Sequence, residues 1–135
     1  PRQVASHHPP LYTGPMWTRE QTREVARNRL KKERRRQAAL KDRRDRAQQH
    51  ARELAVQIAA ADDSVRRIWG FGSTFDQALP YRQTSDIDLA CEGGDIRAWK
   101  TAQASPWDVD WVELDDQEAS MAQSVTSRGV LLYER

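Results

Sequence analysis

The sequence has one cysteine, few aromatic residues and no long apolar run, and each of these shortages argues against a particular kind of structure or binding site. A single cysteine, Cys91, cannot form an internal disulfide, which favours a reducing compartment and a cytoplasmic location. With no histidine or second cysteine nearby, we expect Cys91 to be a small buried hydrophobic residue, neither a metal ligand nor a nucleophile. No apolar stretch approaches the roughly 20 residues that cross a bilayer, so we expect no membrane contact.

Glycine and proline are also missing from Thr18 to Asp62, where good helix formers such as Arg, Glu, Ala, Gln, Lys and Leu fill the sequence. Gln21 stands three residues after Thr18, which is the spacing of a capping box at a helix N-terminus. The pattern predicts one long helix over residues 18–62. Residues 1–17 hold four of the six prolines, and we expect an extended Pro-rich arm there.

The second half of this predicted helix carries an apolar stripe. Its members recur at steps of seven, four, three and four residues, as in a heptad pattern: Leu40, Ala47, Ala51, Leu54 and Ile58. Such a stripe packs either on the rest of the chain or on another copy of itself. A homo-oligomer formed through the long helix is therefore one expectation.

Charge is distributed unevenly along the chain. Residues 19–46 hold 13 Lys and Arg against 5 Asp and Glu, a net of +8, whereas residues 62–135 hold 7 against 14, a net of −7. The basic run 31–46 has three interpretations: a solvated helix face with pairs such as Asp42 and Arg46, a contact with a nucleic-acid backbone, or a docking surface for an acidic protein. Aromatic residues are absent from the run, which argues against base stacking on it.

Paired aspartates are the clearest chemical feature of the acidic half. Asp86 and Asp88 belong to the run Ser-Asp-Ile-Asp-Leu at 85–89, and on a β-strand residues i and i+2 point to the same face. Two carboxylates that close repel each other unless a cation lies between them, and hard oxygen ligands of this kind suit Mg²⁺. A third carboxylate from a later strand would complete a site for one or two metal ions. Asp110 and Asp108 share a face of that strand, and Asp110 is preferred because it lies at the strand's middle.

A glycine and a serine stand upstream of the aspartate pair. Gly72 would let the backbone come close to a phosphate, and Ser73 would offer a hydroxyl and an N–H. Apolar runs around these residues predict strands at Val65–Phe71, Ser85–Cys91, Trp107–Leu114 and Val130–Tyr133. Helices are predicted from Asp95 to about Gln103 and from 115 or 116 to 127. The order predicts an α/β fold over residues 63–135: a small mixed sheet backed by helices and preceded by the long N-terminal helix.

Together, Gly72 and Ser73, the Ser-Asp-Ile-Asp run at 85–88 and Asp110 resemble the minimal nucleotidyltransferases (MNT) of the DNA polymerase beta superfamily. The run Ser-Arg-Gly-Val-Leu-Leu-Tyr-Glu at 127–134 resembles the Arg-x-Gly-hydrophobic-Leu-Tyr-Glu ending of these small domains. The resemblance implies Mg²⁺-dependent transfer of a nucleoside monophosphate from a nucleoside triphosphate to an acceptor, with ATP as the expected nucleotide.

The resemblance also implies a role for each site residue. Asp86 and Asp88 hold Mg²⁺ on the triphosphate, and Asp110 holds a second metal ion and helps to deprotonate the acceptor hydroxyl. Gly72 and Ser73 cradle the terminal phosphates.

The residue after the Gly-Ser pair departs from the family. Many relatives carry an arginine there, whereas this chain has Thr74. Arg82, in the segment that leads to the aspartate pair, is the candidate to reach the triphosphate instead. Arg128 is a further candidate for contact with the triphosphate or the acceptor.

In the resembled family, a stand-alone domain of this size is often the antitoxin partner of a helical HEPN ribonuclease toxin. It neutralises the toxin by AMP transfer, by masking, or by both, and this is the function we expect. One alternative is a catalytically weak or inactive nucleotidyltransferase-fold module that docks a partner through its helix. Another is an enzyme that modifies tRNA or a small molecule.

Overall fold

The computed structural model describes residue 14 and residues 17–135, so most of the expected Pro-rich arm lies outside the described residues. The chain divides into two compact units, one ending at Gln37 and the other comprising Ala38–Arg135. One helix, α1 (Arg19–Ala61), contributes to both. No helix within the described ranges is long and apolar enough to cross a membrane.

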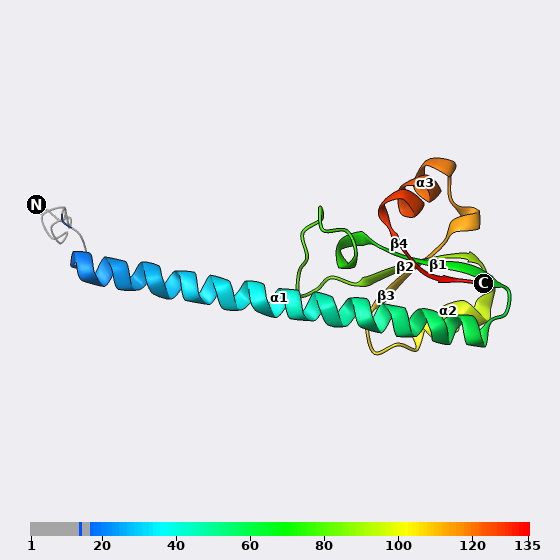
Figure 1. Cartoon of the computed structure of the whole chain (residues 1–135), viewed down its shortest axis with the longest axis horizontal. Coiled ribbons are helices and arrows are strands. Elements are labelled where there is room, and N and C mark those ends of the chain that lie inside the picture. Colours follow the sequence, from blue (N-terminus) through cyan, green and yellow to red (C-terminus); the bar gives the residue numbers. More distant parts are fainter. Residues whose placement is uncertain (1–13, 15–16) are drawn as a thin grey trace, which may run out of the picture. The chain divides into compact units, whose positions relative to one another are not determined.

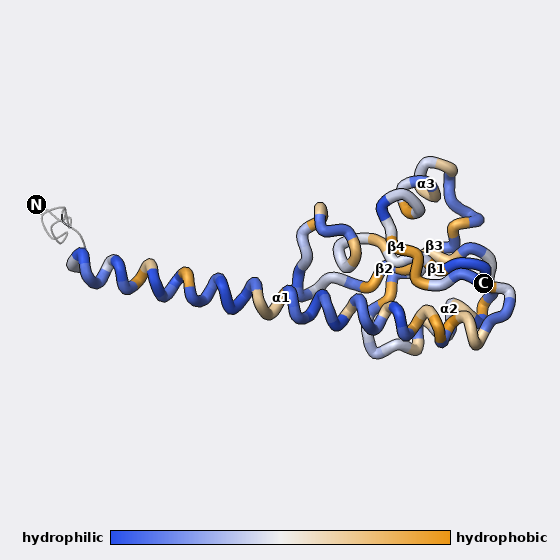
Figure 2. Tube along the Cα trace, in the orientation of Figure 1, coloured by the Kyte–Doolittle hydropathy of each residue, from blue (hydrophilic) through white to orange (hydrophobic). Residues whose placement is uncertain are grey.

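The long helix begins and ends within one residue of its predicted bounds. The backbone N–H of Gln21 donates to Thr18 Oγ1 at 3.1 Å, and the N–H of Thr18 donates to Gln21 Oε1 at 2.8 Å, which is the expected capping box. The expected pair of Arg46 with Asp42 is present at 3.0 Å. Figure 2 shows α1 hydrophilic over most of its length and more apolar toward its C-terminal end. The expected boundaries after residues 17 and 62 stay a prediction.

A four-stranded mixed sheet forms the centre of the unit Ala38–Arg135. Its order is β3-β2-β1-β4, where β1 pairs antiparallel with β2 and with β4, and β2 pairs parallel with β3. The strands are β1 (Val65–Phe71), β2 (Ile87–Gly93), β3 (Val109–Glu113) and β4 (Val130–Glu134). This architecture confirms the predicted α/β fold.

Helices cover both faces of the sheet, as Figure 1 shows for α1 and α2 on one side and α3 on the other. The second half of α1 and α2 (Ile96–Gln103) pack on the face that carries Ile68, Ile87 and Leu89. On the other face Ala90 lies with Leu114 of the short 3-10 helix η3 (Leu114–Asp116) and with α3 (Ala119–Arg128). The carboxylates of the candidate site belong to this second face.

The apolar stripe of α1 is buried within the chain's own unit. Ala47, Ala51, Leu54 and Ile58 are at most 2 % exposed, and Leu40 is half-buried. Packing on the rest of the chain, one of the two expected uses of the stripe, is therefore confirmed. The four buried side chains are not available to join two copies of the chain, so they give the expected homo-oligomer no support.

Cys91 is a core residue, as predicted. Its side chain is 1 % exposed on β2, and burial raises the pKa of its thiol to about 12. A thiol held in its protonated form is a poor nucleophile and a poor metal ligand.

Several predicted boundaries are wrong, and contacts made at two of them give the reason. β2 begins at Ile87 and not at residue 85, because Ser85 Oγ accepts a bond from the Arg82 N–H inside a turn. β3 begins two residues later than predicted, at Val109. The last helix begins at Ala119 instead of 115 or 116, because Asp115 lies in η3 and accepts from the Gly93 N–H at 2.7 Å. By contrast, Asp95 caps α2 as predicted, accepting from the Arg97 N–H.

A buried carboxylate anchors the connection between α1 and the sheet. Asp62 is 0 % exposed and accepts bonds from Ser64, from the N–H groups of Asp95 and Ala98, and from Arg97. Burial favours the protonated form of this carboxyl, but the bonds from Ser64 and Asp95 outweigh burial and hold the pKa of Asp62 well below its usual range.

The C-terminal end of α1 is held by a residue from the far end of the described sequence. The last turn of α1 contains no basic residue. Arg135 Nη2 donates to the carbonyl oxygens of Ala59 at 3.0 Å and Asp62 at 3.4 Å, and its Nε donates to that of Val65 at 2.9 Å. Carbonyl groups that a helix end leaves without partners are thereby satisfied.

Candidate active site

Two carboxylates of the candidate site lie on adjacent parallel strands. Asp88 of β2 and Asp110 of β3 are partners in the strand register. Register partners in neighbouring strands share a face, and their backbones lie about 4.8 Å apart in the hydrogen-bonding direction. The register therefore places Asp110 beside Asp88, while Asp108, whose carbonyl oxygen accepts from the Ile87 N–H at 2.9 Å, runs alongside the start of β2.

The third carboxylate, Asp86, comes directly before β2 and is exposed. Its carbonyl oxygen accepts from Thr74 Oγ1 at 3.0 Å, which ties the start of β2 to the Gly-Ser turn. Burial, the negative charge of Asp110 and then that of Asp86 together raise the pKa of Asp88 to about 6. The charges of the other two carboxylates therefore reach Asp88.

Gly72 brings the backbone of the Gly-Ser turn against Asp88. It lies at the start of a 3-10 turn, η2 (Gly72–Thr74), which follows β1 directly. Gly72 has a φ of +69°, and a Cβ atom there would overlap the Asp88 carboxylate. Only glycine fits both the left-handed backbone and the close approach. Ser73 is the next residue of the same turn and is half-buried.

The donor set fits Mg²⁺ in its chemistry. Asp86, Asp88 and Asp110 offer hard oxygen ligands, and a cation would relieve the repulsion that raises the pKa of Asp88. The described part of the chain contains no group of three His, Cys, Asp or Glu side chains already gathered to hold a metal ion. The expected metal ligands are therefore near one another in the fold, but their side chains do not form a complete coordination site.

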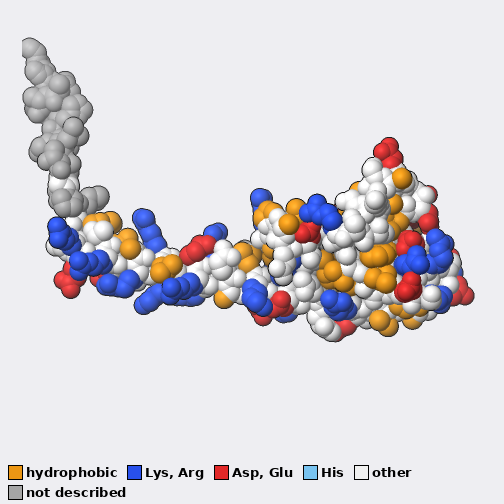
Figure 3. Space-filling model, turned by 45° about the horizontal axis from the view of Figure 1, so that its top comes forward, with side chains coloured by type: hydrophobic (Ala, Val, Ile, Leu, Met, Phe, Trp, Pro, Cys, Tyr) orange, Lys and Arg blue, Asp and Glu red, His pale blue; other side chains and the backbone are white. Residues whose placement is uncertain are grey.

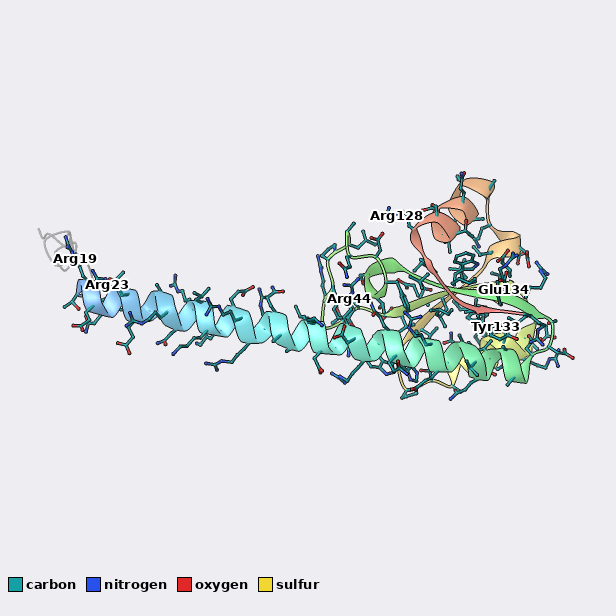
Figure 4. The ribbon with its side chains drawn as sticks, viewed as in Figure 1. Arg19, Arg23, Arg44, Arg128, Tyr133 and Glu134 are labelled. Carbon is teal, nitrogen blue, oxygen red and sulfur yellow. The ribbon has the colours of Figure 1, made fainter. Side chains whose placement is uncertain are left out.

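The two arginines predicted to serve the site lie differently. Arg82 is exposed in the segment before β2. Arg128, on α3, pairs with Asp76, two residues after the η2 turn. Figure 4 shows Arg128 at the end of α3, close to where β4 begins. Contact of either arginine with a nucleotide stays a prediction.

Sequence reasoning missed Arg44, which contacts the Gly-Ser turn from α1. Its Nε donates to the carbonyl oxygens of Ser73 at 3.0 Å and Thr74 at 3.1 Å. The signal was present in the apolar stripe, whose first step runs seven residues from Leu40 to Ala47. Arg44 fills the i+4 position inside that gap and therefore lies on the packed face of the helix.

Comparison with known proteins places the fold. No protein-family model matches the sequence, and no curated protein matches it. A crystal structure of a toxin–antitoxin with AMP-PNP is similar at 28% identity, over 62% of this chain and 73% of that chain, with a TM-score of 0.50. A mutant form of the toxin–antitoxin MntA–HpeT is similar at 25% identity, over the same 62% and 73%, with a TM-score of 0.50.

A third solved structure is a tri-AMPylated Shewanella oneidensis HEPN toxin in complex with MNT antitoxin. It is similar at 24% identity over 68% of this chain and 73% of that chain, with a TM-score of 0.45. The first two similarities confirm the resemblance to MNT antitoxins that Gly72, Ser73 and the aspartates indicate.

Proposed function

We propose that this chain is a Mg²⁺-dependent nucleotidyltransferase that transfers AMP from ATP to a protein, as the MNT antitoxin partner of a HEPN-type ribonuclease toxin. The observation that carries the proposal is the register pairing of Asp88 with Asp110 next to Gly72. The similar toxin–antitoxin structure that contains AMP-PNP supports nucleotide as the substrate class.

Asp86, Asp88 and Asp110 would hold Mg²⁺, which when bound neutralises the triphosphate and the charge that develops during transfer. The acceptor hydroxyl oxygen forms a bond to the α-phosphorus, and the bond from that phosphorus to the bridging oxygen of the β-phosphate breaks. Pyrophosphate leaves with the bonding electron pair. Asp110 takes the proton of the acceptor hydroxyl, because it is the exposed carboxylate of the register pair.

The Gly-Ser turn binds and orients the triphosphate. Since Gly72 has no side chain, its backbone packs directly against the Asp88 carboxylate, which would hold Mg²⁺ on the triphosphate. The Ser73 hydroxyl donates a hydrogen bond to a terminal phosphate. Arg82, exposed in the segment before Asp86, closes on the triphosphate from the solvent side.

A partner protein is the proposed acceptor. Both solved structures that carry the comparison are toxin–antitoxin complexes. The exposed basic residues of α1, seen as blue side chains along the helix in Figure 3, offer a surface for that partner. Asp110 is exposed, so a hydroxyl-bearing side chain of the partner can reach it.

Labelled nucleotides test the proposal directly. The wild-type chain is incubated with α-labelled ATP, CTP, GTP or UTP, Mg²⁺ and host lysate, and the products are separated by size. We expect ATP to label one protein, with no labelling by the double variant Asp86→Asn, Asp88→Asn. If tRNA or a small molecule became labelled instead, the acceptor would be that molecule and the proposed protein acceptor would be wrong. Nucleotide binding without any labelled product would favour a docking module that has lost activity.

A further inference from the structure

Arg44 joins the long helix to the turn on which the proposed chemistry depends. Its Nε donates to two consecutive carbonyl oxygens, those of Ser73 and Thr74. Gln48, one helical turn further along α1, donates from Nε2 to the same Thr74 oxygen at 2.7 Å. Figure 4 shows Arg44 on α1 where the helix passes this part of the chain. Two side chains of α1 therefore hold the carbonyl side of η2.

The contacts continue from the turn to the carboxylates. Thr74 Oγ1 donates to the Asp86 carbonyl oxygen at 3.0 Å, and Gly72, at the start of the same turn, lies against the Asp88 carboxylate. A shift of the turn would therefore move both the backbone that faces Asp88 and the segment that carries Asp86. Because Gly72 permits many backbone conformations by itself, the turn needs contacts from outside to keep one of them.

Arg44 also brings positive charge to a turn whose own residues have none. The turn sequence is Gly-Ser-Thr. The Arg44 guanidinium uses Nε in the two bonds, while its Nη2 is buried with no hydrogen-bond partner among the described residues. Leaving a buried cationic donor without a partner is costly, so the Nη2 group of Arg44 keeps a capacity to donate that the turn does not use.

We propose that Arg44 is a positioning residue for nucleotidyl transfer: from α1 it holds the Ser73 and Thr74 carbonyls, keeps Gly72 against Asp88, and so preforms the surface that receives the triphosphate. This inference rests on the proposed function. It gives the long helix a part in the site that is separate from docking a partner.

Two measurements on the intact chain test the inference. The first is calorimetric binding of AMP-PNP with Mg²⁺ to wild type, Arg44→Ala and Arg46→Ala. Arg46 is the matched control, because it lies on the same helix and pairs only with the exposed Asp42. We expect Arg44→Ala to bind at least about tenfold more weakly, and Arg46→Ala to bind within about twofold of wild type.

The second measurement is hydrogen exchange without nucleotide. The N–H groups of Phe75 and Asp76 donate to the Gly72 carbonyl at 3.1 and 2.8 Å, so they report on the turn itself. In Arg44→Ala these two amides should exchange faster, while the amides of β4 keep their wild-type rates. A purely structural role would instead speed exchange across the whole sheet.

The outcomes separate this inference from the proposed function. If Arg44→Ala binds nucleotide like wild type, the inference is overturned and the proposed function stands. If wild type binds no nucleotide, the proposed function fails and the inference falls with it. If Arg44→Ala does not fold, Arg44→Lys decides: lysine keeps the charge but not the guanidinium geometry, and binding equal to wild type overturns the inference.

Discussion

Gly72 lies so close to the Asp88 carboxylate that a single methyl group on Gly72 would overlap Asp88 Oδ2. The two residues come from different elements, since Gly72 follows β1 and Asp88 lies in β2. Their contact places the start of the Gly-Ser turn against the Asp88 carboxylate.

Replacement of Gly72 by alanine should abolish binding of AMP-PNP with Mg²⁺, because the new methyl group displaces Asp88 and the left-handed φ is strained. The strain alone should cost about 1 kcal/mol of unfolding free energy. Gly93→Ala is the matched control, because Gly93 has a φ of +76° at the other end of β2. We expect that control to lose stability and keep nucleotide affinity; equal binding losses in both variants would argue against a site at Gly72.

Changing both Asp86 and Asp88 to asparagine should abolish metal-dependent nucleotide binding, measured by calorimetry, while the protein stays folded. Without metal, the double variant should melt higher, because burial and neighbouring carboxylates disfavour the charge on Asp88. About 1 kcal/mol, discounted for exposure, corresponds to about 4 °C. Because Asp110 is the register partner of Asp88 and its charge raises the pKa of Asp88, we expect the same loss of binding in Asp110→Asn and none in Asp108→Asn, and the reverse order would reject the assignment of Asp110.

Leu54→Ala should destabilise the chain by about 2–5 kcal/mol, because Leu54 is 2 % exposed in the core between α1 and the sheet. Chemical denaturation followed by circular dichroism measures the change. Val56→Ala on the same helix is the control, because Val56 is 59% exposed and should shift stability by less than about 0.5 kcal/mol. A monomer–oligomer shift in place of lost stability would show that the stripe joins two copies after all.

Asp62→Asn should destabilise the protein by about 1–3 kcal/mol at neutral pH, because the charged acceptor of several buried bonds is lost. The pKa of Asp62 is lowered in the folded state, so its contribution is complete above the ordinary carboxyl pKa near 4 and is lost as pH falls below it. Denaturation midpoints between pH 6 and about pH 2 should therefore fall less steeply in the variant than in wild type. Asp63→Asn, at an exposed neighbour, should keep the wild-type slope.

The basic run 31–46 should bind a partner protein. Pull-down of the native complex should recover one stoichiometric protein that survives nuclease treatment and dissociates as salt rises. Glutamates at Arg34, Arg35 and Arg36 should release it. The same charge change at Arg19, Arg23 and Arg27, also exposed on α1, is the control. Co-purifying RNA or DNA that the first variant loses would identify a nucleic-acid contact instead.

Features that depend on neighbouring residues could be predicted from the sequence. The Thr18 and Gln21 capping box and the Asp95 cap were predictable because the residues that satisfy each other lie within a few positions. Alternation places Asp88 on the sheet face opposite Ile87 and Leu89, but β2 begins only at Ile87, so Asp86 lies just before the strand. The role of these residues in a site stays a prediction.

Contacts between distant segments could not be predicted in the same way. The last helix was predicted to begin at 115 or 116. Instead, Asp115 accepts hydrogen bonds from the N–H of Gly93 in β2 and from the side chain of Arg66 in β1. Arg44 was indistinguishable from the solvated arginines of the basic run, because no residue near it in the sequence indicates a contact with the Ser73 carbonyl. The pairing of Asp110 with Asp88 depends likewise on register, and register is a property of two strands together.

The bonds of Arg135 have a consequence for the order in which the molecule can assemble. The Ala59 and Asp62 carbonyl groups accept hydrogen bonds from Arg135, a residue more than 70 positions later in the sequence. These bonds can form only when β4 pairs with β1. Closing a loop of that length lowers the conformational entropy of the chain before the contact contributes any stabilising free energy. The end of α1 and the edge strand β4 should thus become stable in one step.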